Sequence, residues 1–181
     1  MIIGGEIMGK FLFFDIDGTL VGKSKMVTEK TKWAIQQARQ NGHRAFLCTG
    51  RAPTSIVGDI KNIEFDGAIC SAGGFVIVDG EYIFENFMNQ YILSEVMTLF
   101  INNHILFTLE TKKALYQTPG VNEFFDQKHQ KDCENNLELM RFFQLRRMGE
   151  NRLPIKDFNI LTTGVTKVCF IAPNKQSFYD C

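Results

Sequence analysis

The sequence has no excess of charge of either sign and no long apolar run. Its 181 residues include 20 basic and 20 acidic side chains. A basic surface that would attract nucleic acid or an anionic membrane is therefore not indicated. The apolar runs, such as FLFF (11–14) and VCFIA (168–172), are far shorter than the roughly 20 residues that span a bilayer. We expect neither a nucleic-acid partner nor a membrane partner.

Paired cysteines and a secretory leader are also missing. The five cysteines are an odd number and include no CxxC pair, which is typical of reduced core thiols in a reducing compartment. The first residues, MIIGG, are broken by Glu6, and they leave no room for the apolar region of a signal peptide. We therefore expect a cytoplasmic protein. A second methionine, Met8, suggests that the first seven residues are an extension with little structural role.

The first half of the chain alternates between strand and helix patterns. Apolar strand segments occupy residues 10–16, 43–49 and 66–72, and helical segments occupy 27–42 and 53–60. Thr28 is placed to cap the first of these helices and Gly42 to end it. This alternation predicts an α/β fold with a doubly wound parallel sheet. The unbroken apolar run FLFF within the first of these segments (10–16) predicts a strand buried on both faces.

The pattern changes after Gly73. Two apolar arms flank Asp79-Gly80 (75–84), which predicts a hairpin with a two-residue turn. Beyond it, strands and helices no longer alternate regularly. The expected elements are a helix at 90–103, strands at 105–109 and 113–117, helical material at 120–147, an irregular stretch at 152–164 and a last strand at 166–173. We expect two domains, 9–85 and 86–181, the second of α+β type.

Candidate catalytic residues follow the first strand, in FLFFDIDGTL (11–20). Open α/β sheets bind ligands at the carboxyl ends of their strands. A carboxylate there, Asp15, can coordinate Mg²⁺ and can attack phosphorus. A second acid, Asp17, can protonate a leaving oxygen and later activate water. An ordinary Asp-Gly turn explains Asp17-Gly18, but it does not explain an additional acid directly after four apolar residues.

Candidate phosphate-binding residues follow the second strand, in LCTGR (47–51). Thr49 supplies a hydroxyl and Gly50 allows close approach of the backbone to an anion. The start of the expected helix at 53–60 would face the same crevice, and Arg51 adds a charged donor. A Thr-Gly turn with a solvated Arg51 is the alternative, so this motif gains weight only beside Asp15 and Asp17.

These motifs resemble those of the haloacid dehalogenase superfamily, specifically the Cof-type (IIB) phosphatases. The likeness is carried by DIDGTL (15–20), CTGR (48–51) and SAGGFVIVDGEYIF (71–84). It implies a Rossmann-like core with an α+β type II cap, Mg²⁺ at Asp15 and Asp17, Asp15 as nucleophile, and Asp17 as general acid and base. Thr49 matches the phosphate-binding hydroxyl. Ala72-Gly73-Gly74 stands where many relatives have Asn-Gly.

The sequence departs from that family at its other end. The resemblance implies a third motif with a lysine and a fourth of GDxxND type after the cap. No GDxx[ND] string occurs in residues 86–181, where that motif would lie, and two late lysines, Lys167 and Lys175, are interpreted as surface residues. We therefore expect a truncated core with an incomplete cap. The first strand would then lie at an unpaired sheet edge that favours self-association.

The expected function is Mg²⁺-dependent hydrolysis of a small phosphorylated metabolite through an aspartyl-phosphate, although the chain itself is expected to be a weak or inactive catalyst. Two alternatives remain. One is a non-catalytic truncated product or binding module, and the other is a phosphomutase, which would pass the phosphoryl group to a second hydroxyl.

Overall fold

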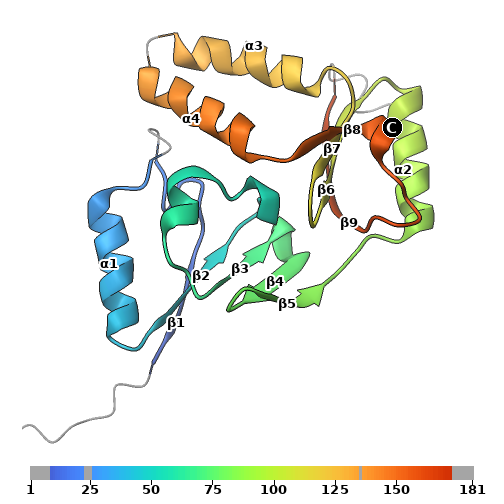
Figure 1. Ribbon diagram of the computed structural model, residues 1–181. Coiled ribbons are helices and arrows are strands. Elements are labelled where there is room, and N and C mark those ends of the chain that lie inside the picture. Colours follow the sequence, from blue (N-terminus) through green and yellow to red (C-terminus); the bar gives the residue numbers. More distant parts are fainter. Residues whose placement is uncertain (1–8, 23–25, 135, 173–181) are drawn as a thin grey trace, which may run out of the picture.

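The computed structural model describes residues 9–22, 26–134 and 136–172, which form two β-sheets with helices around them (Figure 1). The first sheet has strand order β1-β2-β3-β4-β5, and the second has order β8-β7-β6-β9. The strands of the first sheet are β1 (Phe11–Phe14), β2 (Arg44–Cys48), β3 (Gly67–Cys70), β4 (Phe75–Val78) and β5 (Glu81–Glu85).

The first three strands are parallel, as in a Rossmann-like core. Phe14 pairs with Leu47 and Leu47 with Ala68, so the three strands end at the same edge of the sheet. The crossover helix α1 (Glu29–Gln40) is capped by Thr28, whose side chain accepts a hydrogen bond from the amide of Thr31 at 3.1 Å. The α/β fold class and this helix were both predicted correctly.

The first strand was predicted to be buried on both faces. Among the described residues, this prediction is wrong. Phe14 packs against the core cluster that contains Ile35 of α1, but Phe11 and Phe13 are 62% and 57% exposed. β1 pairs only with β2 and forms the edge of the sheet. Helix α1 covers one face, and no described element covers the other.

The segment that follows Arg51 also differs from its prediction. Instead of an α-helix at 53–60 there are two short 3₁₀ helices, η1 (Pro53–Ser55) and η2 (Gly58–Asn62). Val57 between them is extended, and Gly58 has φ +67°. Since a left-handed residue interrupts the intrahelical hydrogen bonds, no continuous helix forms at 53–60, and this segment presents no α-helix N-terminus to the candidate site.

The second half of the described chain is built on the second sheet. Its strands are β6 (Leu106–Thr111), β7 (Leu115–Gln117), β8 (Arg152–Pro154) and β9 (Val165–Ile171), and its helices are α2 (Gln90–Asn102), α3 (Val121–Cys133) and α4 (Leu137–Gly149). β8 and the following η4 (Ile155–Asp157) lie in the stretch that was predicted to be irregular. The helices and the remaining strands were predicted close to their observed positions.

The side chains of β6 alternate between the two faces of this sheet. Phe107 and Leu109 pack in a core cluster with Leu93 and Phe100 of α2. Thr108 and Glu110 point to the other face, where α3 and α4 form an antiparallel hairpin (Figure 1). The second sheet therefore has an apolar side under α2 and a more polar side under the hairpin.

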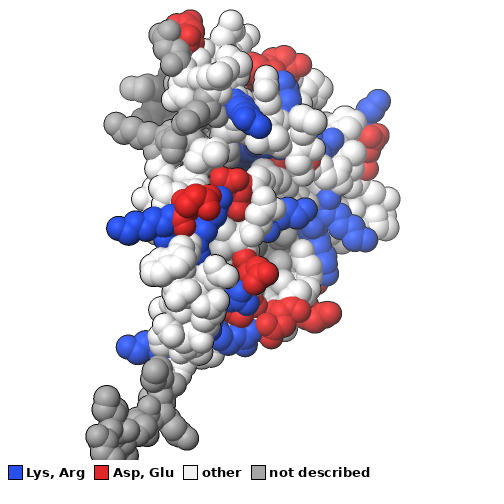
Figure 2. All heavy atoms as spheres, turned by 60° about the vertical axis from the view of Figure 1, so that its left-hand side comes forward, with Lys and Arg blue, Asp and Glu red and all other residues white. Residues whose placement is uncertain are grey.

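The hairpin at the end of the first sheet has the predicted turn, with Asp79 and Gly80 at φ +51° and +86°. β5 ends at Glu85 and every strand of the second sheet comes later, while the boundary between 85 and 86 stays a prediction. Among the described residues, no helix is long and apolar enough to cross a membrane. On the face shown in Figure 2, acidic and basic side chains are interspersed.

Candidate functional site

The loop after β1 presents two carboxylates. Asp15 and Asp17 are both exposed, and Ile16 between them is fully buried. The main chain then turns back tightly, with Gly18 at φ +95° and its amide donating to the carbonyl of Val21 at 2.9 Å. Burial of Ile16 anchors the loop, so the two acids beside it point away from the core.

The loop after β2 lies directly beside this one. Thr49 is buried, its amide donates to the carbonyl of Ile69 at 2.9 Å, and its hydroxyl oxygen accepts a hydrogen bond from the Arg51 amide at 3.1 Å. Gly50 is exposed between them. The hydroxyl oxygen of Thr49 thus stabilises the turn at 49–51. The hydroxyl hydrogen can be donated to a ligand.

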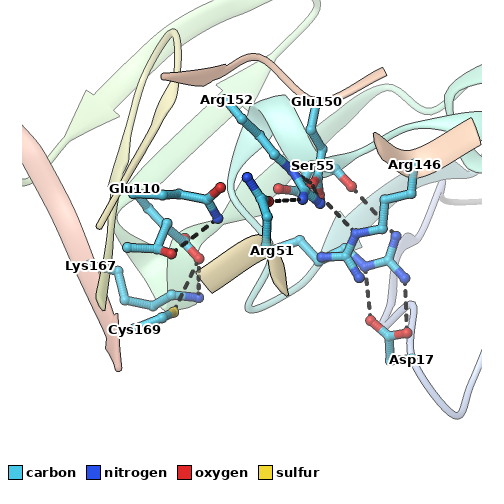
Figure 3. A network of polar contacts seen from close by, with 12 residues as sticks. Asp17, Arg51, Ser55, Glu110, Arg146, Glu150, Arg152, Lys167 and Cys169 are labelled. Atoms are coloured by element: carbon cyan, nitrogen blue, oxygen red, sulfur yellow. Dashed lines mark hydrogen bonds and ion pairs between the residues drawn. The ribbon is translucent and has the colours of Figure 1, made fainter. Parts of the chain in front are cut away.

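Arg51 joins the two loops. Its Nε and Nη2 atoms each lie 2.8 Å from one carboxylate oxygen of Asp17, which makes a bidentate ion pair. The side chain of Arg51 is only 7% exposed, whereas that of Asp17 is 46% exposed. Nη1 of Arg51 also reaches the carbonyl oxygen of Ser55 at 3.5 Å. The predicted phosphate ligand is therefore held against the predicted acid (Figure 3).

The loop after β3 completes this edge of the first sheet. Ser71 and Ala72 have φ of +49° and +55°, a left-handed conformation that is uncommon outside glycine. The amide of Ser71 donates to the carbonyl of Arg51 at 2.8 Å, and that of Ala72 donates to the carbonyl of Thr49 at 3.3 Å. The two neighbouring loops are thus tied together through the main chain.

A buried carboxylate of the second sheet, Glu110, contacts these loops. It is 8% exposed and accepts hydrogen bonds from the hydroxyl of Ser71 at 3.2 Å and the thiol of Cys169 at 3.4 Å. Burial, with Glu110 nearby, raises the pKa of Cys169 to about 11, so Cys169 stays protonated at neutral pH. Glu110 therefore connects the second sheet to the core loops.

Lys167 is not the surface residue that the sequence suggested. Its ammonium group lies 2.9 Å from Oε1 of Glu110 and donates to the carbonyl oxygen of Gly50. Its side chain is 28% exposed. Lys167, on the last described strand of the second sheet, thus places a positive charge next to the candidate phosphate loop. Lys175, the other late lysine, lies outside the described residues.

A cavity of about 500 Å³ lies between the second sheet and the α3–α4 hairpin. Its wall includes Glu150, which is fully buried and accepts hydrogen bonds from Arg146 at 2.8 Å and from Arg152 at 2.5 and 2.9 Å. Burial alone would raise the pKa of Glu150, but the two guanidinium groups outweigh it and hold that pKa below its ordinary value. Figure 3 shows this cluster facing Arg51 and Ser55 of the core.

The described residues offer few ligands for a metal ion. They contain no group of three or more His, Cys, Asp and Glu side chains placed to hold one. Asp15 and the main-chain carbonyl of Asp17 are hard oxygen donors of the type that Mg²⁺ prefers. Because Mg²⁺ at phosphoryl-transfer sites often takes only one or two carboxylates plus phosphate and water, these residues fit the ion, but with a small donor set.

Sequence reasoning missed Glu110, Glu150 and the role of Lys167. These residues belong to no motif. Glu110 and Lys167 act through contacts with residues 39 and 117 positions away in the chain. Glu150 instead pairs with Arg146 and Arg152, four and two positions away, a local spacing that could have indicated the ion pairs but not the burial of the carboxylate.

Comparison with known proteins identifies the fold. The haloacid dehalogenase-like hydrolase family matches residues 12–175. YkrA of Bacillus subtilis, which is named as a phosphatase, is 30% identical over 77 residues, covering 42% of this chain and 30% of YkrA. The chain therefore spans less than a third of that curated relative.

Two solved structures show the same arrangement over nearly the whole chain. A haloacid dehalogenase-like hydrolase from B. subtilis has a TM-score of 0.77 at 16% identity, with 96% of this chain and 65% of that one covered. BT4131, described as a subclass IIB sugar phosphatase, has a TM-score of 0.65 at 17% identity, covering 94% and 61%. With residues 12–175 matched, the chain belongs to the haloacid dehalogenase-like hydrolases.

Proposed function

We propose that the protein hydrolyses small phosphate monoesters, with Asp15 as the nucleophile. The observation that carries this proposal is the Asp17–Arg51 ion pair, which brings the loops after β1 and β2 together beside the exposed Asp15. This arrangement supports a reaction in which Asp15 acts as nucleophile and Asp17 as the second acid, beside a loop that would bind the phosphate.

The reaction would take two steps. A carboxylate oxygen of Asp15 attacks phosphorus, the ester P–O bond breaks, and Asp17 gives a proton to the departing alkoxide. Water then attacks the aspartyl-phosphate while Asp17 takes its proton, and Asp15 is regenerated. Thr49 and the main chain at Gly50 would donate hydrogen bonds to the phosphoryl oxygens.

Arg51 adds a condition to this scheme. Both oxygens of Asp17 accept hydrogen bonds from its guanidinium, so at least one of these bonds has to open before Asp17 can reach a leaving group. Arg51 would then be near the phosphoryl group, as predicted for a phosphate ligand. When bound by Asp15 and the Asp17 carbonyl, Mg²⁺ would offset the negative charge that gathers around phosphorus.

Substrate class and location are part of the same proposal. BT4131, described as a sugar phosphatase, and YkrA, named as a phosphatase, support a small phosphorylated metabolite. The four described cysteines, Cys48, Cys70, Cys133 and Cys169, are free thiols, which supports a reducing compartment, the cytoplasm.

The test is phosphate release from para-nitrophenyl phosphate with Mg²⁺, compared between the wild-type chain, Asp15→Asn and Asp157→Asn. Asp157 is an exposed acid on η4, outside the site, and serves as the matched control. We expect weak but measurable release from the wild-type chain, lost in Asp15→Asn and kept in Asp157→Asn. Equal release from the first two proteins would refute the proposal.

A second measurement does not depend on turnover. Beryllium fluoride binds aspartate carboxylates as a mimic of aspartyl-phosphate, and its ¹⁹F NMR signal should appear with the wild-type chain and be absent with Asp15→Asn. With a sugar phosphate as substrate, free phosphate indicates hydrolysis, and an isomerised sugar phosphate would indicate a phosphomutase instead.

A further inference from the structure

The main-chain carbonyls of the loop at 49–51 are held from two different parts of the fold. The first and last of them accept hydrogen bonds from amides of the loop after β3, at 3.3 and 2.8 Å. The middle carbonyl, that of Gly50, accepts instead from the ammonium group of Lys167. Lys167 lies on β9 of the second sheet. The second sheet thus adds a contact to this loop that the loop after β3 does not supply.

The contact with Lys167 fixes the direction of the next amide. The peptide between Gly50 and Arg51 is trans and planar, so its N–H points away from its carbonyl and from Lys167. This N–H donates to the hydroxyl oxygen of Thr49 at 3.1 Å. Because the oxygen is engaged as an acceptor there, the hydroxyl hydrogen is left to donate elsewhere. A chain of hydrogen bonds therefore runs from Lys167 through the peptide to the hydroxyl of Thr49.

Glu110 holds the ammonium group of Lys167 in place. Oε1 of Glu110 lies 2.9 Å from Nζ of Lys167, and the side chain of Glu110 is only 10% exposed. The other carboxylate oxygen accepts a hydrogen bond from the hydroxyl of Ser71 at 3.2 Å (Figure 3). Since the carboxylate offsets the charge of the ammonium group, Lys167 offers the loop a directed hydrogen bond more than a long-range attraction for anions.

We propose that Lys167 is a positioning residue for phosphate binding. By holding the carbonyl of Gly50, it keeps the amide of Arg51 on the oxygen of Thr49, and the Thr49 hydroxyl then donates to a phosphoryl oxygen. Each bond in such a chain polarises the next one, so the hydroxyl is a stronger donor when Lys167 is in place. The inference rests on the proposed function, because the phosphate is taken to bind beside Thr49.

The test is calorimetric titration of inorganic phosphate into the full chain in the presence of Mg²⁺. We expect Lys167→Met to weaken phosphate binding about ten-fold, which is the worth of about one hydrogen bond. Lys167→Arg keeps a cationic donor and should recover most of the affinity.

Lys112→Met is the matched control. Lys112 also joins the second half of the chain to the core, with its ammonium group 2.5 Å from Glu85 and 3.9 Å from the centre of the Tyr82 ring. These partners belong to β5 and not to the loop at 49–51. A residue that only ties the two sheets together would resemble Lys112. We therefore expect phosphate affinity to stay within about two-fold of wild type in Lys112→Met, whatever the change in melting temperature.

A double-mutant cycle shows whether Lys167 acts through Thr49. Thr49→Val removes the hydroxyl and should itself weaken phosphate binding. In that background, Lys167→Met should cost less than about two-fold more, because the chain of hydrogen bonds is already broken. The ten-fold loss in the single Lys167→Met variant should also persist in about 0.5 M NaCl, where attraction between exposed charges is screened.

Five results would overturn the inference: no phosphate binding to the wild-type chain, equal affinity in wild type and Lys167→Met, an equal loss in Lys112→Met, losses that add in the double variant, or a loss that disappears in salt. An affinity in Lys167→Arg no better than in Lys167→Met would overturn it as well. Failure of the proposed function is read separately, from phosphate release and beryllium fluoride binding in the wild-type and Asp15→Asn chains. A beryllium fluoride signal that depends on Asp15, found together with equal phosphate affinities, would refute the role of Lys167 alone.

Discussion

Substitution of Glu150 tests how much its ion pairs with Arg146 and Arg152 contribute to the free energy of unfolding. Its carboxylate is fully buried, and the side chains of its partners Arg146 and Arg152 are 34% and 22% exposed. Removing one member of a buried ion pair costs about 3–5 kcal/mol when its partner is left buried. Because both arginines keep some contact with water, we expect Glu150→Gln to lower the free energy of unfolding by about 2–3 kcal/mol.

Differential scanning calorimetry measures this change. For a chain of this length, 1 kcal/mol corresponds to a shift of about 2–4 °C, so the melting temperature should fall by roughly 4–12 °C. Glu95→Gln, at an exposed position on α2, is the matched control and should leave the melting temperature unchanged. A Glu150→Gln protein as stable as wild type would refute the reasoning.

The effect should also depend on pH in a defined way. The folded-state pKa of Glu150 lies below its ordinary value of 4.5. A group with a lowered pKa stabilises the fold fully above its unfolded-state value and loses this contribution as pH falls through the folded-state value. The difference between wild type and Glu150→Gln should therefore be constant from pH 7 to about pH 5 and shrink below about pH 4.5. A difference that vanishes above pH 5 would contradict the assignment.

Three further predictions concern the candidate site and the sheet edge. Asp17→Asn should lower kcat for phosphate release by about 10²- to 10⁴-fold, and an unchanged kcat would exclude the acid–base role. Lys167→Met should raise deuterium exchange in the segment 49–55, because the donor to the Gly50 carbonyl is lost; equal exchange would show that this contact is dispensable. The wild-type chain should self-associate at micromolar concentration through β1, and Phe13→Lys should shift its gel-filtration peak towards the monomer. A wild-type chain that elutes as a monomer would count against self-association through the unpaired edge of β1.

Local patterns predicted those parts of the fold that depend on neighbouring residues. Thr28 caps α1 because an N-cap hydroxyl needs only the first amides of its own helix. Asp79-Gly80 makes a two-residue turn because both residues tolerate positive φ. Even the proximity of Asp17 and Arg51 followed from a simple rule, since parallel neighbouring strands end at the same edge of a sheet.

The wrong predictions have identifiable physical causes. Pro53 suits the first turn of a helix, but Gly58 takes a left-handed conformation and divides the segment into two 3₁₀ helices. An apolar run such as that of β1 shows which residues can be buried, but it does not show what covers them. Phe13 is exposed because β1 is an edge strand here and only one face has a described helix against it.

The candidate site depends on contacts that no local pattern contains. Lys167 meets the carbonyl of Gly50 across 117 positions of the chain, and Ser71 meets Glu110 across 39. Their sequence neighbours only specify strands and turns, and the meeting itself is set by how the second sheet docks on the core loops. A lysine at the start of a strand is solvated unless such docking brings an acceptor to it. For this reason the two motifs after β1 and β2 were visible in the sequence, whereas the residues that tie the second sheet to them required the three-dimensional structure.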